Sequence, residues 1–296
     1  MKNRILKYAG YIVFGIFLFV LLVYIRFPYE KVKERIISSF ENNSQYNLAI
    51  GDLHPLFPPG LNFKDIVVTQ DENKQDTPVF QATNISAKVR IIPFLIGNLS
   101  FIYTMDAYEG RIKGKAKIND GKDGEETSIT ADIHSVNLTQ YPFLQERYGV
   151  SLSGKIQGKL DIKGNFSIPR VKGNIILRID NGKIQGMNIK GMAVKDVSFN
   201  GFDSSFRIQK DEVFLERLSL LGEDIDSFIT GKALLKKDIG KSPLDLKVRL
   251  KPKRRFERRY RLIFRLLKNM KDKNGYISFP VQGTLGDPEV TILPKI

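Results

Sequence analysis

Apolar and polar residues alternate along most of this chain from Asn47 onward. From Gly110 to Ile118, every even position is apolar or glycine and every odd position is Arg or Lys. The same alternation keeps its phase in segments 85–91, 153–164, 244–251 and 276–285. Successive side chains of a strand point to opposite faces, and a parallel sheet covered on both sides would show unbroken apolar runs instead. The pattern therefore predicts antiparallel strands with one apolar face and one polar face.

Turn-forming residues separate these segments, and few helices are available to cover the sheet. The turns are rich in Asp, Asn, Gly and Pro, as in DENKQDTP, NDGKDGEE and DIGKSP. Helical spacing favours only three helices: Pro28 to Asn43, Leu138 to Tyr148 and Arg254 to Lys273. We therefore expect a mainly β (α+β) fold. Its apolar face either closes as a sandwich or curls into a half-pipe that something else fills.

An apolar run precedes the β region. Tyr8 to Ile25 has 18 residues without a charge, and as a helix it would span about 27 Å, close to the thickness of a bilayer core. A cleaved signal peptide is the alternative, but no A-x-A-like site follows the run. Basic residues in the short preceding tail favour a cytoplasmic N-terminus; they are Lys2, Arg4 and Lys7. We expect an uncleaved transmembrane helix with the rest of the chain outside the cytoplasm.

These features divide the chain into three parts. Residues 1–27 form the cytoplasmic tail and anchor, residues 28–150 a first helix-plus-β unit, and residues 151–296 a second β unit with the basic helix 254–273. A weak internal repeat supports two related units, because IKGNFSIPRV and VQGTLGDPEV share a Gly, a Pro and a Val at matching positions. In each copy, we expect a strand to end at the Gly and the Pro to open the next strand.

Composition removes several classes of function. The chain of 296 residues has no Cys and two His, so a thiolate metal site, an iron–sulfur cluster, a cysteine nucleophile and a multi-histidine centre are excluded. His54 and His134 lack a nucleophile or carboxylate at a motif spacing. The acidic cluster at residues 223–226 lacks the Gly and distal Glu of a calcium loop. We expect no catalytic residues, no metal and no cofactor, and we keep an envelope enzyme only as a minor alternative.

The net charge of +15 is concentrated in one segment. Lys251 to Lys273 contains eleven basic and two acidic residues, and its apolar residues follow helical spacing. Either this face is merely solvated, or it contacts anionic lipid headgroups or an acidic partner. Nucleic acid is disfavoured because the expected orientation places the segment outside the cytoplasm. The candidate contact residues are Arg254, Arg255, Arg258, Arg259, Arg261, Arg265 and Lys268.

Several motifs resemble a known family. After the N-terminal anchor and amphipathic helix come LHPLFPPGL, IPFLIGNL, GKIQGKLDIKG and the terminal FPVQGTLGDPEV. Together they resemble the AsmA-like envelope proteins of diderm bacteria, and within them the GspN family associated with type II secretion. The resemblance implies a non-enzymatic, single-pass inner-membrane protein with a periplasmic β body, a component of a type II secretion system. Other secretion subunits would be its partners. The alternative it implies is an AsmA-like β-groove protein in lipid transport or outer-membrane biogenesis.

Overall fold

The computed structural model describes most of the chain from residue 26 onward and scattered positions before it. The described residues are 11, 14, 15, 18, 22, 24, 26–44, 46–56, 59–72, 75–95, 98–121, 124–165, 170–186, 188–189, 192–193, 196–236 and 239–291.

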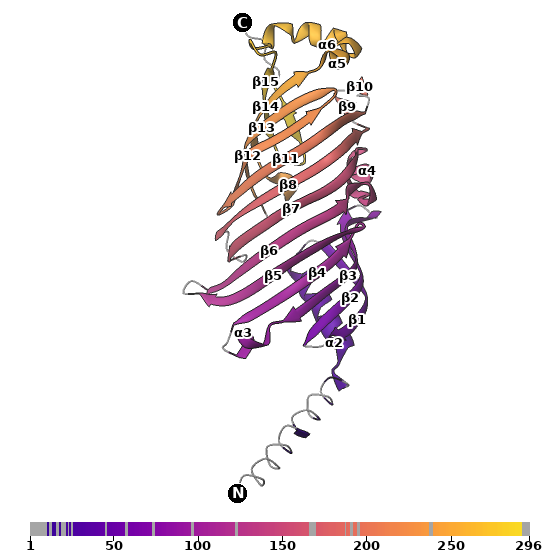
Figure 1. The fold of residues 1–296 in the computed structure, drawn as a ribbon, viewed down its shortest axis with the longest axis vertical. Coiled ribbons are helices and arrows are strands. Elements are labelled where there is room, and N and C mark those ends of the chain that lie inside the picture. The colour runs from indigo at the N-terminus through magenta and orange to yellow at the C-terminus, as the bar shows by residue number, and fades with distance from the viewer. Residues whose placement is uncertain are drawn as a thin grey trace.

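One large sheet dominates the fold (Figure 1). It is 14-stranded and follows chain order, apart from β9 (Asn188–Ile189) and β10 (Met192–Ala193), which pair with each other. All of its neighbouring strands are antiparallel. Its strands are β1 (Tyr46–Leu56), β2 (Gly60–Glu72), β3 (Gln75–Val89), β4 (Leu99–Ala107), β5 (Gly110–Gly121), β6 (Gly124–Asn137), β7 (Ser151–Asn165), β8 (Arg170–Gln185), β11 (Val197–Gln209), β12 (Glu212–Gly222), β13 (Ile225–Leu234), β14 (Leu244–Pro252), β15 (Ile277–Gly283) and β16 (Pro288–Val290). The mainly β, antiparallel prediction is confirmed.

The helices are short and lie at the margins of the sheet. They are α2 (Tyr29–Asn43), α3 (Ile91–Leu95), η1 (Leu138–Gln140), α4 (Phe143–Tyr148), η2 (Ile239–Lys241), α5 (Arg254–Arg259), α6 (Arg261–Leu266) and η3 (Lys268–Met270). The helix expected from residue 28 is confirmed as α2, which packs along the edge strand β1. There the Lys33 ammonium donates to the Gly51 carbonyl oxygen at 2.6 Å, so part of the exposed backbone of this edge is satisfied.

The sheet runs without a break through the boundary expected between residues 150 and 151. β6 pairs with β7 over residues 127–137, and β7 pairs with β8 along nearly its whole length. In the described part of the two repeat copies, Gly164 and Gly283 have positive φ and each faces the opening of the next strand. β15 ends at its glycine as expected, whereas β7 ends one residue after Gly164. Pro288 begins β16 as expected, whereas the other repeat proline, at position 169, lies outside the described residues.

The sheet is open and curved. Its edge strands β1 and β16 each pair with one neighbour only in the described part of the chain. The short helix α4, about 9 Å long, contacts both β3 and β7. Four strand spacings separate these two strands, about 19 Å in a flat sheet, so the sheet must curl around α4. The closed sandwich, one of the two expected outcomes, is not what the chain forms.

The expected membrane span, Tyr8 to Ile25, lies mostly outside the described residues. Within those that are described, no helix is long and apolar enough to cross a bilayer.

Candidate functional site

A continuous row of uncharged residues, all apolar except one glycine and one serine, crosses the sheet on one face. Residues opposite each other in antiparallel strands project to the same side, so the register traces the row from strand to strand. Starting on β1 and ending on β15, it comprises Leu53, Phe63, Ile85, Met105, Ile112, Ile133, Gly158, Leu177, Ser204, Leu218, Ile229, Val248 and Phe279. We call the face that carries this row the inner face. The row contains no charged residue.

The inner face is only partly covered by protein. Most side chains of the row are half-buried, and Leu53, Ser204 and Val248 are the buried members. The chain exposes 20343 Å² of surface, about 1.6 times the roughly 12,700 Å² expected of a compact monomer of this mass. The expectation of an apolar face therefore holds, and of the two expected outcomes the open half-pipe is the one that fits this exposure. Too few helices lie over the open sheet to exclude water from it.

The opposite, outer face is polar and carries cross-strand ion pairs. Arg178 lies 2.8 Å from Asp203, and Arg207 lies 2.6 Å from Glu216. His134 also lies on this side, opposite Arg111, and is exposed. These exposed ion pairs contribute little to the free energy of folding, but their charges favour a solvent-exposed outer face. The two faces of one sheet thus differ sharply in polarity.

Aromatic side chains close the inner face where α4 lies. The ring centroids of Phe80 and Tyr108 are 6.1 Å apart, and those of Tyr108 and Tyr141 are 5.5 Å apart. The Gln81 N–H donates to the Tyr108 hydroxyl oxygen at 2.8 Å, while burial raises the pKa of this phenol above its ordinary value. Phe80 packs in one cluster with Phe63, Ile85 and Met105 of the row, so it lies on the inner face. The aromatic cluster therefore places α4 on that side and makes the inner face the concave one here.

A glycine and a tyrosine shape the inner face between β4 and β6. The Tyr103 ring lies across Gly114, and its hydroxyl donates to the Thr130 carbonyl oxygen at 3.1 Å. A Cβ atom at position 114 would overlap both the ring and that carbonyl. Burial raises the pKa of the Tyr103 phenol, which favours the neutral donor. The ring thus covers a gap that glycine leaves on the sheet.

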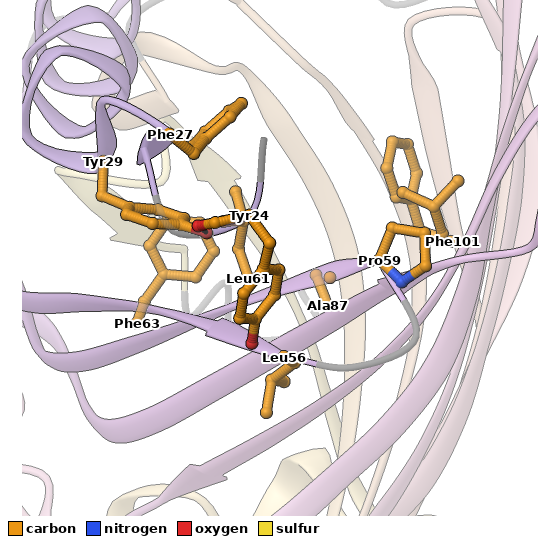
Figure 2. Close-up of a pocket in the computed structure, with 11 residues that line it drawn as sticks. Tyr24, Phe27, Tyr29, Leu56, Pro59, Leu61, Phe63, Ala87 and Phe101 are labelled. Atoms are coloured by element: carbon orange, nitrogen blue, oxygen red, sulfur yellow. Dashed lines mark hydrogen bonds between the residues drawn. The ribbon is translucent and has the colours of Figure 1, made fainter. Parts of the chain in front are cut away.

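A cavity of about 470 Å³ lies at the end of the inner face nearest α2 (Figure 2). Its lining combines β1 to β4 with the segment before and at the start of α2, and none of the described residues that line it is charged. Tyr29 anchors this segment, since its hydroxyl donates to the Tyr24 carbonyl oxygen at 3.0 Å. Its size lies within the range of about 300–1,000 Å³ typical of small-molecule sites. The lining residues are Tyr24, Phe27, Tyr29, Leu56, Pro59, Gly60, Leu61, Phe63, Ala87, Val89 and Phe101.

Sequence reasoning did not identify this cavity. The strand residues that line the cavity could have been predicted. Leu61 and Phe63 alternate with polar residues along β2, and Ala87 and Val89 do so along β3, so the apolar residues of each strand share the inner face. Its aromatic wall from the N-terminal segment depends on how the chain turns from that segment onto β1. No local pattern reports such a turn.

The continuous basic helix expected over Arg254 to Lys273 is wrong. The segment consists of α5, α6 and η3, interrupted at Tyr260, whose φ of −112° and ψ of 42° leave the helical region. Basic residues three and four apart repel one another along a single helix, and many of them are so spaced here. We call residues 254–273 the basic cap. It lies at the end of the molecule opposite the start of α2 (Figure 1).

The basic cap buries one aromatic residue, half-buries two more and exposes its arginines. Phe256 is buried, with its ring centroid 4.8 Å from that of Tyr260 and 5.9 Å from that of Phe264. Both acidic residues are engaged, Glu257 by Lys271 and Asp272 by Arg249. Within the described residues, no ion pair involves the six candidate arginines, and all six are exposed; they are Arg254, Arg255, Arg258, Arg259, Arg261 and Arg265. The side chain of Lys268 is outside the described set.

The remaining polar residues that were considered as site residues lie apart from one another. His54 lies 4.0 Å from Asp52 at an exposed position on β1, far along the sheet from His134 on β6. Over the described ranges, no group of three or more His, Asp or Glu residues converges. Comparison of the chain with family models, with curated proteins and with solved structures gives no match.

Proposed function

We propose that this protein is a membrane-anchored, non-enzymatic protein whose inner face holds the acyl chains of lipids. One observation carries the proposal: an uncharged, mostly apolar row runs from β1 to β15 of the open sheet, and the chain leaves most of it half-exposed. Exposed apolar patches of this extent mark interaction sites. Each methylene of a ligand that leaves water contributes about 0.8 kcal/mol.

The shape of the face favours long, flexible apolar ligands over compact ones. The row continues from the cavity beside α2 to β15, past the aromatic cluster at α4, so its long, narrow shape matches a linear chain. The scarcity of polar groups on the row favours a ligand recognised by its hydrocarbon part. Acyl chains meet both requirements.

The anchor and location belong to the same proposal. The uncharged run from Tyr8 to Ile25 supports a single span, and the basic tail before it supports a cytoplasmic N-terminus. The body would then lie in the periplasm of a diderm bacterium, with its N-terminal helix in the inner membrane. The resemblance to AsmA-like proteins supports the same location and lipid transport as the process served.

Lipid analysis of the purified full chain tests the proposal. Neighbouring residues on β8 and β12 offer matched variants, because Leu177 and Leu220 lie on the inner face, whereas Ile176 and Leu221 lie on the outer face and are 55% and 44% exposed. Mass spectrometry should detect phospholipid bound to the unaltered chain. The double variant Leu177→Gln, Leu220→Gln should lose most of it, and Ile176→Gln, Leu221→Gln should retain it. Equal lipid content in both variants would contradict the proposal.

A role as a component of a type II secretion system is the second candidate. It is supported by the terminal FPVQGTLGDPEV motif, which forms the β15–β16 hairpin at one edge of the sheet. All three residues of β16 are exposed, and an exposed edge strand is a surface on which a partner can pair. Cross-linking in membranes should then join this edge to a secretion subunit, and deletion of the protein should reduce secretion of folded substrates. Normal secretion after deletion would exclude this role.

A further inference from the structure

The connection between β3 and β4 exposes three large apolar side chains. They belong to α3, where Ile91 is 45%, Ile92 78% and Phe94 59% exposed. Scattered single apolar residues on a surface are ordinary, but three within four residues form a patch. We call these three residues the apolar tip. Neither the row on the inner face nor the sheet pairing uses them.

The apolar tip lies at the same end of the long axis as the start of α2 (Figure 1). It also adjoins the cavity. Val89 and Phe101 pair with each other on the strands that α3 connects, and both line the cavity. The exposed patch and the cavity therefore share the end of the molecule at which α2 begins.

Basic residues flank the apolar tip. Arg90 directly precedes α3, and its N–H donates to the Ser100 carbonyl oxygen at 2.8 Å. Lys117 pairs with Ser100, and Lys115 pairs with Ile102, so both lie on β5 near the same sheet margin. All three basic side chains are exposed, and none forms an ion pair with an acidic residue that the structure describes. Apolar side chains flanked by cations match the interface of an anionic bilayer.

We propose that the apolar tip inserts into the interfacial layer of an anionic phospholipid bilayer, the one that carries the N-terminal anchor. The inference rests on the proposed anchor but does not require acyl chains on the inner face. Insertion would fix the body relative to the membrane at two points, the anchor and α3. The cavity would then open at the bilayer surface instead of facing solvent.

A fluorescent probe at the tip tests this inference in the full chain. Because the sequence contains no Cys, Ile92→Cys gives a single labelling position for an environment-sensitive dye. Ile176→Cys and Leu221→Cys are matched controls, since both replace exposed apolar residues on the outer face away from this end. Each labelled chain is reconstituted into phosphatidylglycerol-containing vesicles, with or without nitroxide-labelled acyl chains. Circular dichroism establishes that each folds.

The expected result is a blue-shifted emission at position 92 that loses most of its intensity to the nitroxide lipid, with little loss at positions 176 and 221. Emission at position 92 that is no more quenched than at the controls would overturn the insertion. Equal strong quenching at all three positions would overturn it too, because the whole body would then lie on the bilayer. Carbonate extraction of the same vesicles tests the anchor separately. A chain released by carbonate refutes the anchor, and with it the two-point attachment.

Discussion

At the scale of single residues, the inner face depends on glycines that admit aromatic rings. Gly114 lies beneath the Tyr103 ring, whereas Gly201 on β11 has no atom within 4 Å of the position where its Cβ would stand. Gly114→Ala should therefore lower the free energy of unfolding by about 1–3 kcal/mol through overpacking. Gly201→Ala should change it by less than about 0.5 kcal/mol. Denaturant titration of the full chain in detergent measures both, and equal effects would show that the Tyr103 ring does not occupy this gap.

The exposure of the inner face also sets the cost of a charge there. Leu160 is half-buried on β7, so Leu160→Lys can direct its ammonium along the open face to water. We expect a loss of about 1–2 kcal/mol, less than full burial of a charge would cost. Lys159→Gln, on the outer face, removes only the exposed 3.9 Å pair with Asp132 and should cost less than about 0.5 kcal/mol. A larger loss for Lys159→Gln would mean that the two faces are assigned in reverse.

At the scale of elements, the basic cap is the feature with the most unbalanced charge. Its exposed arginines should bind anionic headgroups, each contributing about 1 kcal/mol near the surface, with screening within about 10 Å at 0.1 M salt. The full chain held in a neutral nanodisc should thus bind separate anionic vesicles at low salt and release them at high salt. Replacement by Gln of Arg254, Arg255, Arg258, Arg259 and Arg261 should abolish this binding.

A charge-matched variant on the sheet provides the control for the cap. Five exposed lysines can be replaced by Gln without touching the cap; they are Lys155, Lys159, Lys163, Lys172 and Lys247. This variant should bind anionic vesicles nearly as well as the unaltered chain. If both five-residue variants lose binding equally, overall charge accounts for it and the cap is only a solvated surface. Stronger binding to an acidic protein or to nucleic acid than to vesicles would likewise reject lipid as its target.

Elements were predictable where their signal is local. The alternation of apolar and basic residues from Gly110 to Ile118 predicted β5, because the face to which each side chain points follows from its position in the strand. The same pattern could not decide between a sandwich and a half-pipe, since the curvature depends on contacts of α4 with both β3 and β7, two strands that are far apart in sequence. In the basic cap, by contrast, a local pattern was present but led to a wrong prediction. Helical spacing of its apolar residues was present, but charge repulsion along one helix outweighed it. The apolar tip was missed because α3 is too short to show periodicity.

At the scale of the whole molecule, an uncleaved anchor should hold the body on the far side of the membrane. Intact-mass analysis of the membrane-bound protein should give the mass of the full chain, and loss of about the first 25 residues would favour a signal peptide. An alkaline phosphatase fusion after Gly149 should be active, because that enzyme requires an oxidising compartment for its disulfides. An inactive phosphatase together with a fluorescent cytoplasmic reporter at the same position would reverse the orientation.

Photo-cross-linking in cells tests most directly whether acyl chains occupy the inner face. It compares neighbouring positions of the same strand that project to opposite faces, on each of three strands. A photoreactive amino acid placed at Leu160, Leu177 or Ile229 projects from the inner face, and one at Lys159, Ile176 or Thr230 projects from the outer face. If acyl chains occupy the inner face, irradiation should yield phospholipid adducts at the first three positions and few at the others, as measured by mass spectrometry of the purified chain. Adducts that are absent from the inner positions, or equally abundant on both faces, would contradict the account.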